Sequence, residues 1–141
     1  MIDLNVVLDV VQKREPHFAA SARVLVEARR GLYEGMLPAH ALTTIHYISE
    51  KYSGREVADR TVDWLLASFE VVPAAKGDFL RARTLGMKDF EDAVVACAAL
   101  AGECDLVVTR NVEGFAEAPI RALTPEEWLE ERERMVAGED D

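Results

Sequence analysis

The chain has 141 residues, half of them apolar, and a formal net charge of −10. This length allows one domain with a substantial core and excludes two domains of ordinary size. No segment approaches the roughly 18 consecutive apolar residues of a membrane span, and the N-terminus lacks the basic region and apolar run of a signal peptide. We therefore expect a cytoplasmic protein with no membrane partner.

The negative charge is concentrated near the C-terminus. Residues 126–141 contain eight acidic residues and two arginines, which leaves the body of the chain only mildly acidic. Nucleic-acid binding usually depends on Lys and Arg, so the total charge argues against it, but a local basic rim beside a metal-binding cluster would permit it. The alternative is solvated surface charge with no common partner. The basic residues available for a rim are Arg14, Arg29, Arg30, Lys51, Arg55, Arg81, Arg83, Lys88 and Arg110.

The expected elements alternate between helices and short β-rich runs. The first strand ends at Asp3, and the next β-rich runs cover residues 35–39, 69–73, 105–109 and 120–123. Helices are expected at about 7–13, 18–30, 42–52, 56–67, 76–85 and 89–101, and from Thr124 onward. Long segments separate most of the strands, which favours parallel pairing through right-handed crossovers. The pattern predicts an α/β sandwich.

Polar residues occur in three segments that are otherwise apolar. Asp3 and Asn5 follow the first strand, Asp89 and Asp92 open a helix, and Thr109 and Asn111 follow the strand at 105–109. Ligands of an open parallel sheet bind at the carboxyl ends of the strands, so these side chains can meet at one edge. Clustered carboxylates suit Mg²⁺ or Mn²⁺, and such ions activate water and offset charge on a phosphodiester.

The two acids of the second segment have a simpler alternative explanation. Asp89 has the position of an N-cap, and the helix dipole favours acids such as Glu91 and Asp92 in a first turn. The setting of Asp92 favours a site, because the residues after it, 93–101, are all apolar or small. A carboxylate at the mouth of a covered helix needs a partner.

Three motifs in this order resemble a known family. They are Asp3-x-Asn5-Val6-x-Leu8, Asp89-x-x-Asp92-Ala93 and Val107-Val108-Thr109-Arg110-Asn111-x-x-x-Phe115. In order, spacing and context they resemble the PIN domain, and the closing segment 122–129 is also similar to the end of such domains. Each motif alone is short, so the specificity comes from their order.

The resemblance implies a three-layer α/β/α sandwich on a central parallel sheet, and metal-dependent endoribonuclease activity. We expect a single domain over residues 1–130 and an acidic C-terminal tail over 131–141, partly disordered. Many small bacterial members are toxins of toxin–antitoxin pairs, and dimers are common in the family. The implied partners are therefore an RNA substrate, a cognate antitoxin and a second copy of the chain.

The resemblance also assigns roles to individual residues. Asp3 and Asp92 match acids of the family, Asn5 and Thr109 match polar motif residues, and Asp89 matches an extra acid of some members. The expected ligands of Mg²⁺ or Mn²⁺ are thus Asp3, Asp89 and Asp92, with Asn5, Thr109 and Asn111 orienting water and ligands. For Asp9, a place near the site and a surface role remain equally open.

Two positions depart from the family pattern. Thr44 stands where an acid is usual in the helix after the second strand, and Glu50 cannot replace it because six residues carry it to the other side of that helix. Asn111 stands where an acid usually follows the fourth strand, so it offers an amide oxygen without a charge. We expect weaker metal binding than in a site with every acid in place.

These departures motivate a second hypothesis, a catalytically degenerate PIN domain that binds RNA or a protein partner. A third is a phosphotransfer domain of the haloacid dehalogenase or receiver type, which also places an Asp after its first strand. The first of these types needs an acid where Asn5 stands, and both usually need a lysine near Thr109, so the sequence disfavours it.

Overall fold

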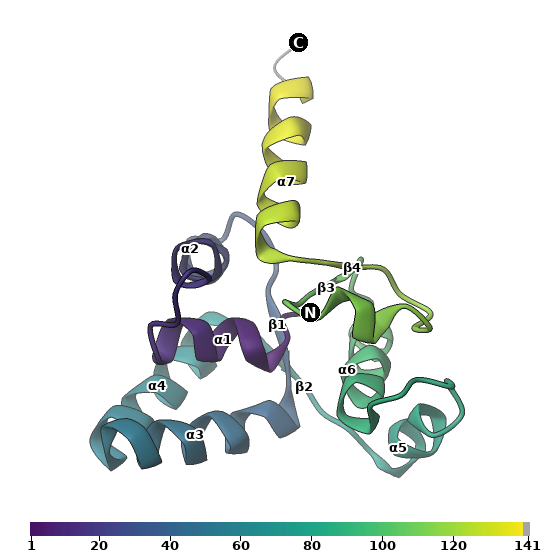
Figure 1. The fold of residues 1–141 in the computed structure, drawn as a ribbon, viewed down its shortest axis with the longest axis horizontal. Coiled ribbons are helices and arrows are strands. Elements are labelled where there is room, and N and C mark those ends of the chain that lie inside the picture. Colours follow the sequence, from purple (N-terminus) through teal and green to yellow (C-terminus); the bar gives the residue numbers. More distant parts are fainter. Residues whose placement is uncertain (140–141) are drawn as a thin grey trace.

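The computed structural model describes residues 1–139 and shows alternating helices and short strands (Figure 1). The strands are β1 (Met36–Pro38), β2 (Glu70–Val72), β3 (Val107–Val108) and β4 (Ala122–Leu123). The helices are α1 (Leu4–Val11), α2 (Phe18–Arg29), α3 (Ala39–Ser53), α4 (Arg55–Ser68), α5 (Lys76–Ala82), α6 (Phe90–Ala101) and α7 (Pro125–Glu139), with a 3-10 helix η1 (Val112–Phe115).

The N-terminal segment joins two pairs of parallel strands into one array. Strand β1 pairs with β2, and β3 pairs with β4. Between the pairs, Ile2 N donates to Met36 O at 2.8 Å and Asp3 N donates to Val108 O at 2.9 Å. The order across the array is therefore β2, β1, residues 1–3, β3, β4, and the predicted parallel topology is confirmed.

Side-chain alternation along these strands makes two hydrophobic cores. Ile2, Leu37 and Val108 belong to the core shared with α1, α2, α3, α4 and α7, whereas Met1 and Val107 belong to the core shared with α6. Successive strand residues point to opposite faces, so β1, β3 and β4 each supply both cores. Figure 1 shows the result, with α1 to α4 on one side of the strands and α5 and α6 on the other. The three-layer α/β/α arrangement is confirmed.

The start of α1 differs from the prediction. The helix begins at Leu4 rather than near Val7, because Asp3 acts as its N-cap and its side chain accepts a hydrogen bond from Leu4 N. The first strand is correspondingly short, since Ile2 makes only a single bridge to Val108. Asp3 thus ends the sheet segment and starts the helix at once, which places its carboxylate at the edge of the sheet.

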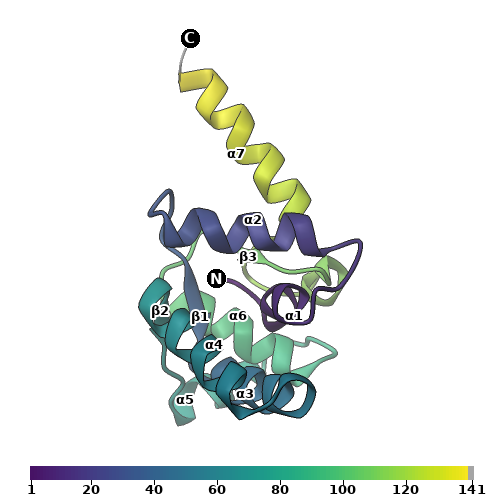
Figure 2. The same ribbon diagram turned by 90° about the vertical axis from the view of Figure 1, so that its left-hand side faces the viewer.

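The C-terminal helix α7 continues past residue 130, where the predicted domain ends. Residues 131–139, expected in the acidic C-terminal tail, belong to α7, and Asp140 and Asp141 lie outside the described residues. The domain boundary at residue 130 and the partial disorder of the tail stay predictions. The base of α7 is anchored by Trp128, which is 7% exposed and packs edge to face on Tyr33. Figure 2 shows the rest of α7 extending away from the domain above α2.

Within residues 1–139, every helix is too short or too polar to cross a membrane. The two cysteines are free thiols, Cys97 buried in α6 and Cys104 half-buried beyond it. A buried free cysteine packs as a small apolar side chain.

Close packing at Gly35, just before β1, gives a test of this fold. A Cβ atom at Gly35 would lie 2.8 Å from the ring of Phe69 and 3.1 Å from the Cβ of Ala28. Gly35→Ala should lower the free energy of unfolding by about 1–3 kcal/mol through overpacking, measured by urea denaturation. Gly77→Ala is the control, because no atom lies within 4 Å of its added methyl group. Equal stability of the two variants would contradict this packing.

Candidate metal centre

Asp3 is held in one orientation at the edge of the sheet. Its Oδ1 accepts a hydrogen bond from Leu4 N at 2.8 Å, and its Oδ2 accepts one from Thr109 Oγ1 at 2.7 Å. The side chain is only 3% exposed. Thr109 directly follows β3, the neighbour of residues 1–3 in the array, so the strand pairing itself brings these two side chains together.

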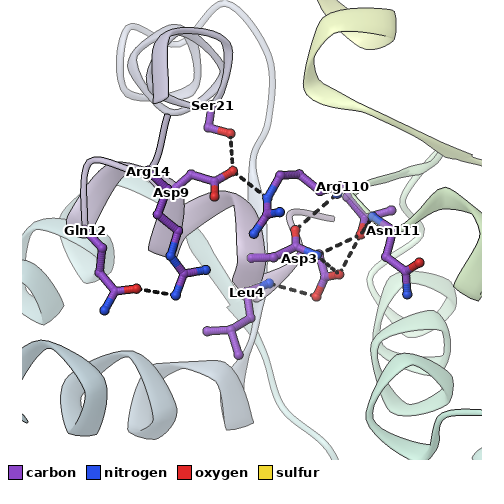
Figure 3. A network of polar contacts seen from close by, with 10 residues as sticks. Asp3, Leu4, Asp9, Gln12, Arg14, Ser21, Arg110 and Asn111 are labelled. Atoms are coloured by element: carbon purple, nitrogen blue, oxygen red, sulfur yellow. Dashed lines mark hydrogen bonds and ion pairs between the residues drawn. The ribbon is translucent and has the colours of Figure 1, made fainter. Parts of the chain in front are cut away.

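Asn5 connects α1 to the loop after β3. Its Nδ2 lies 3.3 Å from both Asp3 Oδ2 and Thr109 Oγ1, and its Oδ1 accepts a hydrogen bond from Arg110 N at 3.2 Å. Thr109 Oγ1 also accepts from Asn111 N at 3.0 Å. Figure 3 shows this network between Asp3 and the loop that carries Arg110 and Asn111. These contacts satisfy the buried polar groups and leave the Asp3 carboxylate facing the site.

The start of α6 supplies the other acids. Asp89 is exposed and caps the helix, its Oδ1 accepting from Asp92 N at 2.9 Å. One carboxylate oxygen each of Asp3, Glu91 and Asp92 lies within 4.8 Å of the others. Asp89 is outside that group, so the structure brings together Asp3 and Asp92 but adds Glu91, and a ligand role for Asp89 stays a prediction.

Two residues of this site escaped the sequence analysis. Glu91 resembled an ordinary first-turn acid, and His40 resembled an isolated histidine. His40 Nε2 lies 3.3 Å from Glu91 Oε1. The available signal was position: His40 is in the first turn of the helix that follows β1, at the same carboxyl edge as Asp3. This contact connects α3 to the acid group through Glu91.

The loop after β3 also approaches the acids of α6. Asn111 Nδ2 is 3.5 Å from Asp92 Oδ2, a long contact. A Cβ atom at Gly114 would lie 2.8 Å from Asp92 Oδ2 and would also collide with the Asn111 amide. Glycine is required here by the close approach of the η1 backbone to the site.

Three other positions considered in the sequence lie outside the group of Asp3, Glu91 and Asp92. Asp9 is fully buried, which excludes the surface role, and it contacts Arg110 rather than the acid cluster. Thr44 lies one turn beyond His40 on α3 and is half-buried. Glu50 is exposed near the far end of α3, 3.8 Å from His46, as its helical position predicted.

Asp3 and Asp92 hold their protons more tightly than an ordinary aspartate. Burial is the largest cause that raises the pKa of Asp3 to about 6, although the Thr109 hydrogen bond opposes it. Burial and then the charges of Asp3, Asp89 and Glu91 raise the pKa of Asp92 to about 7. Desolvation and mutual repulsion both disfavour the charged forms, and a cation among the three oxygens would relieve both.

The raised pKa values predict how stability depends on pH in the metal-free protein. The folded chain binds these protons more tightly than the unfolded chain, whose Asp pKa is near 3.8, so the free energy of unfolding should fall as pH rises from about 4 to about 7. Asp92→Asn removes one titrating group and should flatten that fall. Urea denaturation in EDTA across this range checks both expectations. A fall of equal size in the variant would contradict the assignment to Asp92.

Comparison with known proteins agrees with this architecture. A sequence model of the PIN domain matches residues 1–113. The fold is similar to a chain of VapBC2 from Rickettsia felis solved with a DNA fragment from the promoter, at TM-score 0.68 and 17% identity, covering 88% of this chain and 96% of that chain. It is also similar to a chain of a toxin–antitoxin complex from Klebsiella pneumoniae, at TM-score 0.66 and 19% identity, covering 88% and 95%.

Comparison with curated protein sequences gave no significant match. The match to the PIN model covers most of the chain, including Asp3, Asp92 and the segment after β3. The solved structures share the fold at low identity. On the sequence match, supported by this architecture, the chain belongs to the PIN domain family.

Proposed function

We propose that this protein is a metal-dependent endoribonuclease that hydrolyses RNA phosphodiester bonds. The observation that carries the proposal is the convergence of Asp3, Glu91 and Asp92 oxygens within 4.8 Å at the carboxyl edge of the parallel strands. Three acids from two separate elements form this site, and burial raises the pKa of two of them, Asp3 and Asp92. Such an arrangement costs stability unless a cation or protons neutralise it.

The donor set fits Mg²⁺ or Mn²⁺. All three groups are carboxylates, and hard oxygen ligands suit these ions better than the softer transition metals. When bound, the ion supplies an activated water and offsets charge on the phosphodiester in the transition state. Asp3, Glu91 and Asp92 would hold it.

The remaining residues of the site act on these ligands. Thr109 and Asn5 hold Asp3 in position through the contacts at its Oδ2. His40 holds Glu91. Asn111, which replaces the family's usual acid, places amide donor and acceptor atoms beside Asp92 and can orient water or a phosphate oxygen without adding charge.

The biological role we propose is that of the toxin in a toxin–antitoxin pair. What supports it is the likeness in fold to chains solved in toxin–antitoxin complexes. The proposed partners are accordingly an RNA substrate and a cognate antitoxin, and a second copy of the chain is a further predicted partner. In this role the antitoxin would suppress cleavage when both proteins are present.

The decisive experiment is cleavage of a labelled, structured RNA pool by purified protein with Mn²⁺, Mg²⁺ or EDTA. We expect cutting with either ion and none in EDTA, since the acids alone supply no activated water. Asp92→Asn of confirmed fold should lose at least about 100-fold in rate, on the order of 3 kcal/mol.

Absence of cutting by the folded wild-type protein under excess Mn²⁺ would overturn the nuclease proposal. RNA binding that persists in EDTA would then favour the degenerate binding module, which Thr44 and Asn111 motivate. Cutting in EDTA would instead argue against a metal-dependent reaction.

A further prediction distinguishes Glu91 as a metal ligand from Asp89 as a helix cap. Glu91→Gln should weaken Mn²⁺ binding on the order of tenfold, because affinity depends on the number of charged ligands. Asp89→Asn keeps a good N-cap residue and removes a charge outside the acid group, so it should weaken binding much less. Calorimetric titration with Mn²⁺ measures both. An equal loss in the two variants would make Asp89 a ligand, as the sequence suggested.

A further inference from the structure

Arg110 contacts α1 at two points beside the acidic site. Its backbone N donates to Asn5 Oδ1 at 3.2 Å, and its side-chain Nε lies 2.8 Å from Asp9 Oδ2. Asn5 and Asp9 are four residues apart, so they share one face of the helix. Figure 3 shows the Arg110 side chain reaching from the loop beside Asn111 toward Asp9. Arg110 is therefore anchored at both its backbone and its side chain to α1, the helix that Asp3 caps.

The carboxylate that holds Arg110 is itself deeply buried. Asp9 is 0% exposed, and its Oδ2 also accepts a hydrogen bond from Ser21 Oγ of α2 at 2.9 Å. A buried carboxylate is costly without a charged or hydrogen-bonded partner. Asp9 and Ser21 thus form a fixed anchor, built from two helices, for one side of the guanidinium.

The other side of the guanidinium remains open. The ion pair uses Nε alone and lacks the alignment of a hydrogen bond, and the second oxygen of Asp9 has no hydrogen-bond partner among the described residues. Neither Nη atom donates a hydrogen bond to another residue of the described chain, and the side chain is 27% exposed. A pair with a purely structural role gains most from bidentate geometry. Here the two Nη atoms of the guanidinium are left free to bind a ligand.

We propose that Arg110 binds a phosphate of the RNA backbone next to the one that is cleaved, with Asp9 and Ser21 holding the guanidinium in place. This inference rests on the proposed function. The planar fork matches phosphate oxygens, and a chain of net charge −10 needs a local cation to bring RNA to an acidic centre. Arg110 lies between Thr109 and Asn111, which contact the acids on either side.

The test measures RNA binding apart from cleavage. In an Asp92→Asn background and EDTA, the affinity for a fluorescein-labelled single-stranded RNA oligonucleotide is measured by anisotropy at several salt concentrations. Arg110→Gln should weaken binding about 3- to 10-fold and reduce the slope of log K against log salt by about 0.7, the value for one phosphate contact on a single strand. Arg110→Lys should retain the slope. Arg55→Gln, at the start of α4 beyond the far end of α3, should change neither.

Loss of Arg110 also leaves Asp9 buried without its partner, so stability needs its own control. Asp9→Asn combined with Arg110→Gln removes both charges and should show the same reduced slope in a folded protein. An unchanged slope in this double variant overturns the proposal and leaves the nuclease proposal standing. Failure of the Asp92→Asn parent to bind RNA overturns the phosphate site, whereas the nuclease proposal is judged separately by the cleavage assay.

Discussion

The insertion of residues 1–3 between β1 and β3 is the constraint on which the rest of this molecule depends. Three residues with backbone hydrogen bonds to both neighbours join the two strand pairs, and their alternating side chains enter both cores. Because Asp3 leaves the sheet and caps α1 in a single step, its carboxylate can only lie at the carboxyl edge. The hydrogen bond from Thr109 then fixes it against the end of β3.

Acidic side chains and one arginine both lie at the carboxyl edge of the sheet. Burial first, and then the charge of neighbouring acids, raises the pKa values of Asp3 at the start of α1 and Asp92 in α6. Beside them, the loop after β3 carries Arg110, whose buried counter-ion holds only one nitrogen of its guanidinium. An acid cluster suited to a cation thus lies on the same side of the sheet edge as a group suited to phosphate, and the proposed nuclease activity depends on both.

Most of the fold was predictable because its signals are local. Apolar periodicity marked most helices, and the long connections favoured parallel pairing. The differences between expectation and structure lie at the ends of helices. The cap at Asp3 moved the start of α1, and the packing of Trp128 on Tyr33 anchors an α7 that continues beyond the predicted domain. Within the site, Glu91 and Asp9 were ambiguous because a helix places acids in its first turn or on its surface for reasons unrelated to any ligand.

The sequence by itself determined the α/β class, the parallel topology and three of the polar segments that meet at the site, because strand ends and helix starts are encoded in neighbouring residues. Only the tertiary structure decided which oxygens converge. It brought Glu91 into the group with Asp3 and Asp92, placed His40 against Glu91, left Asp89 as a cap, and buried Asp9 beneath Arg110. These outcomes depend on how helices distant in sequence rotate and pack against the sheet, which no local pattern specifies.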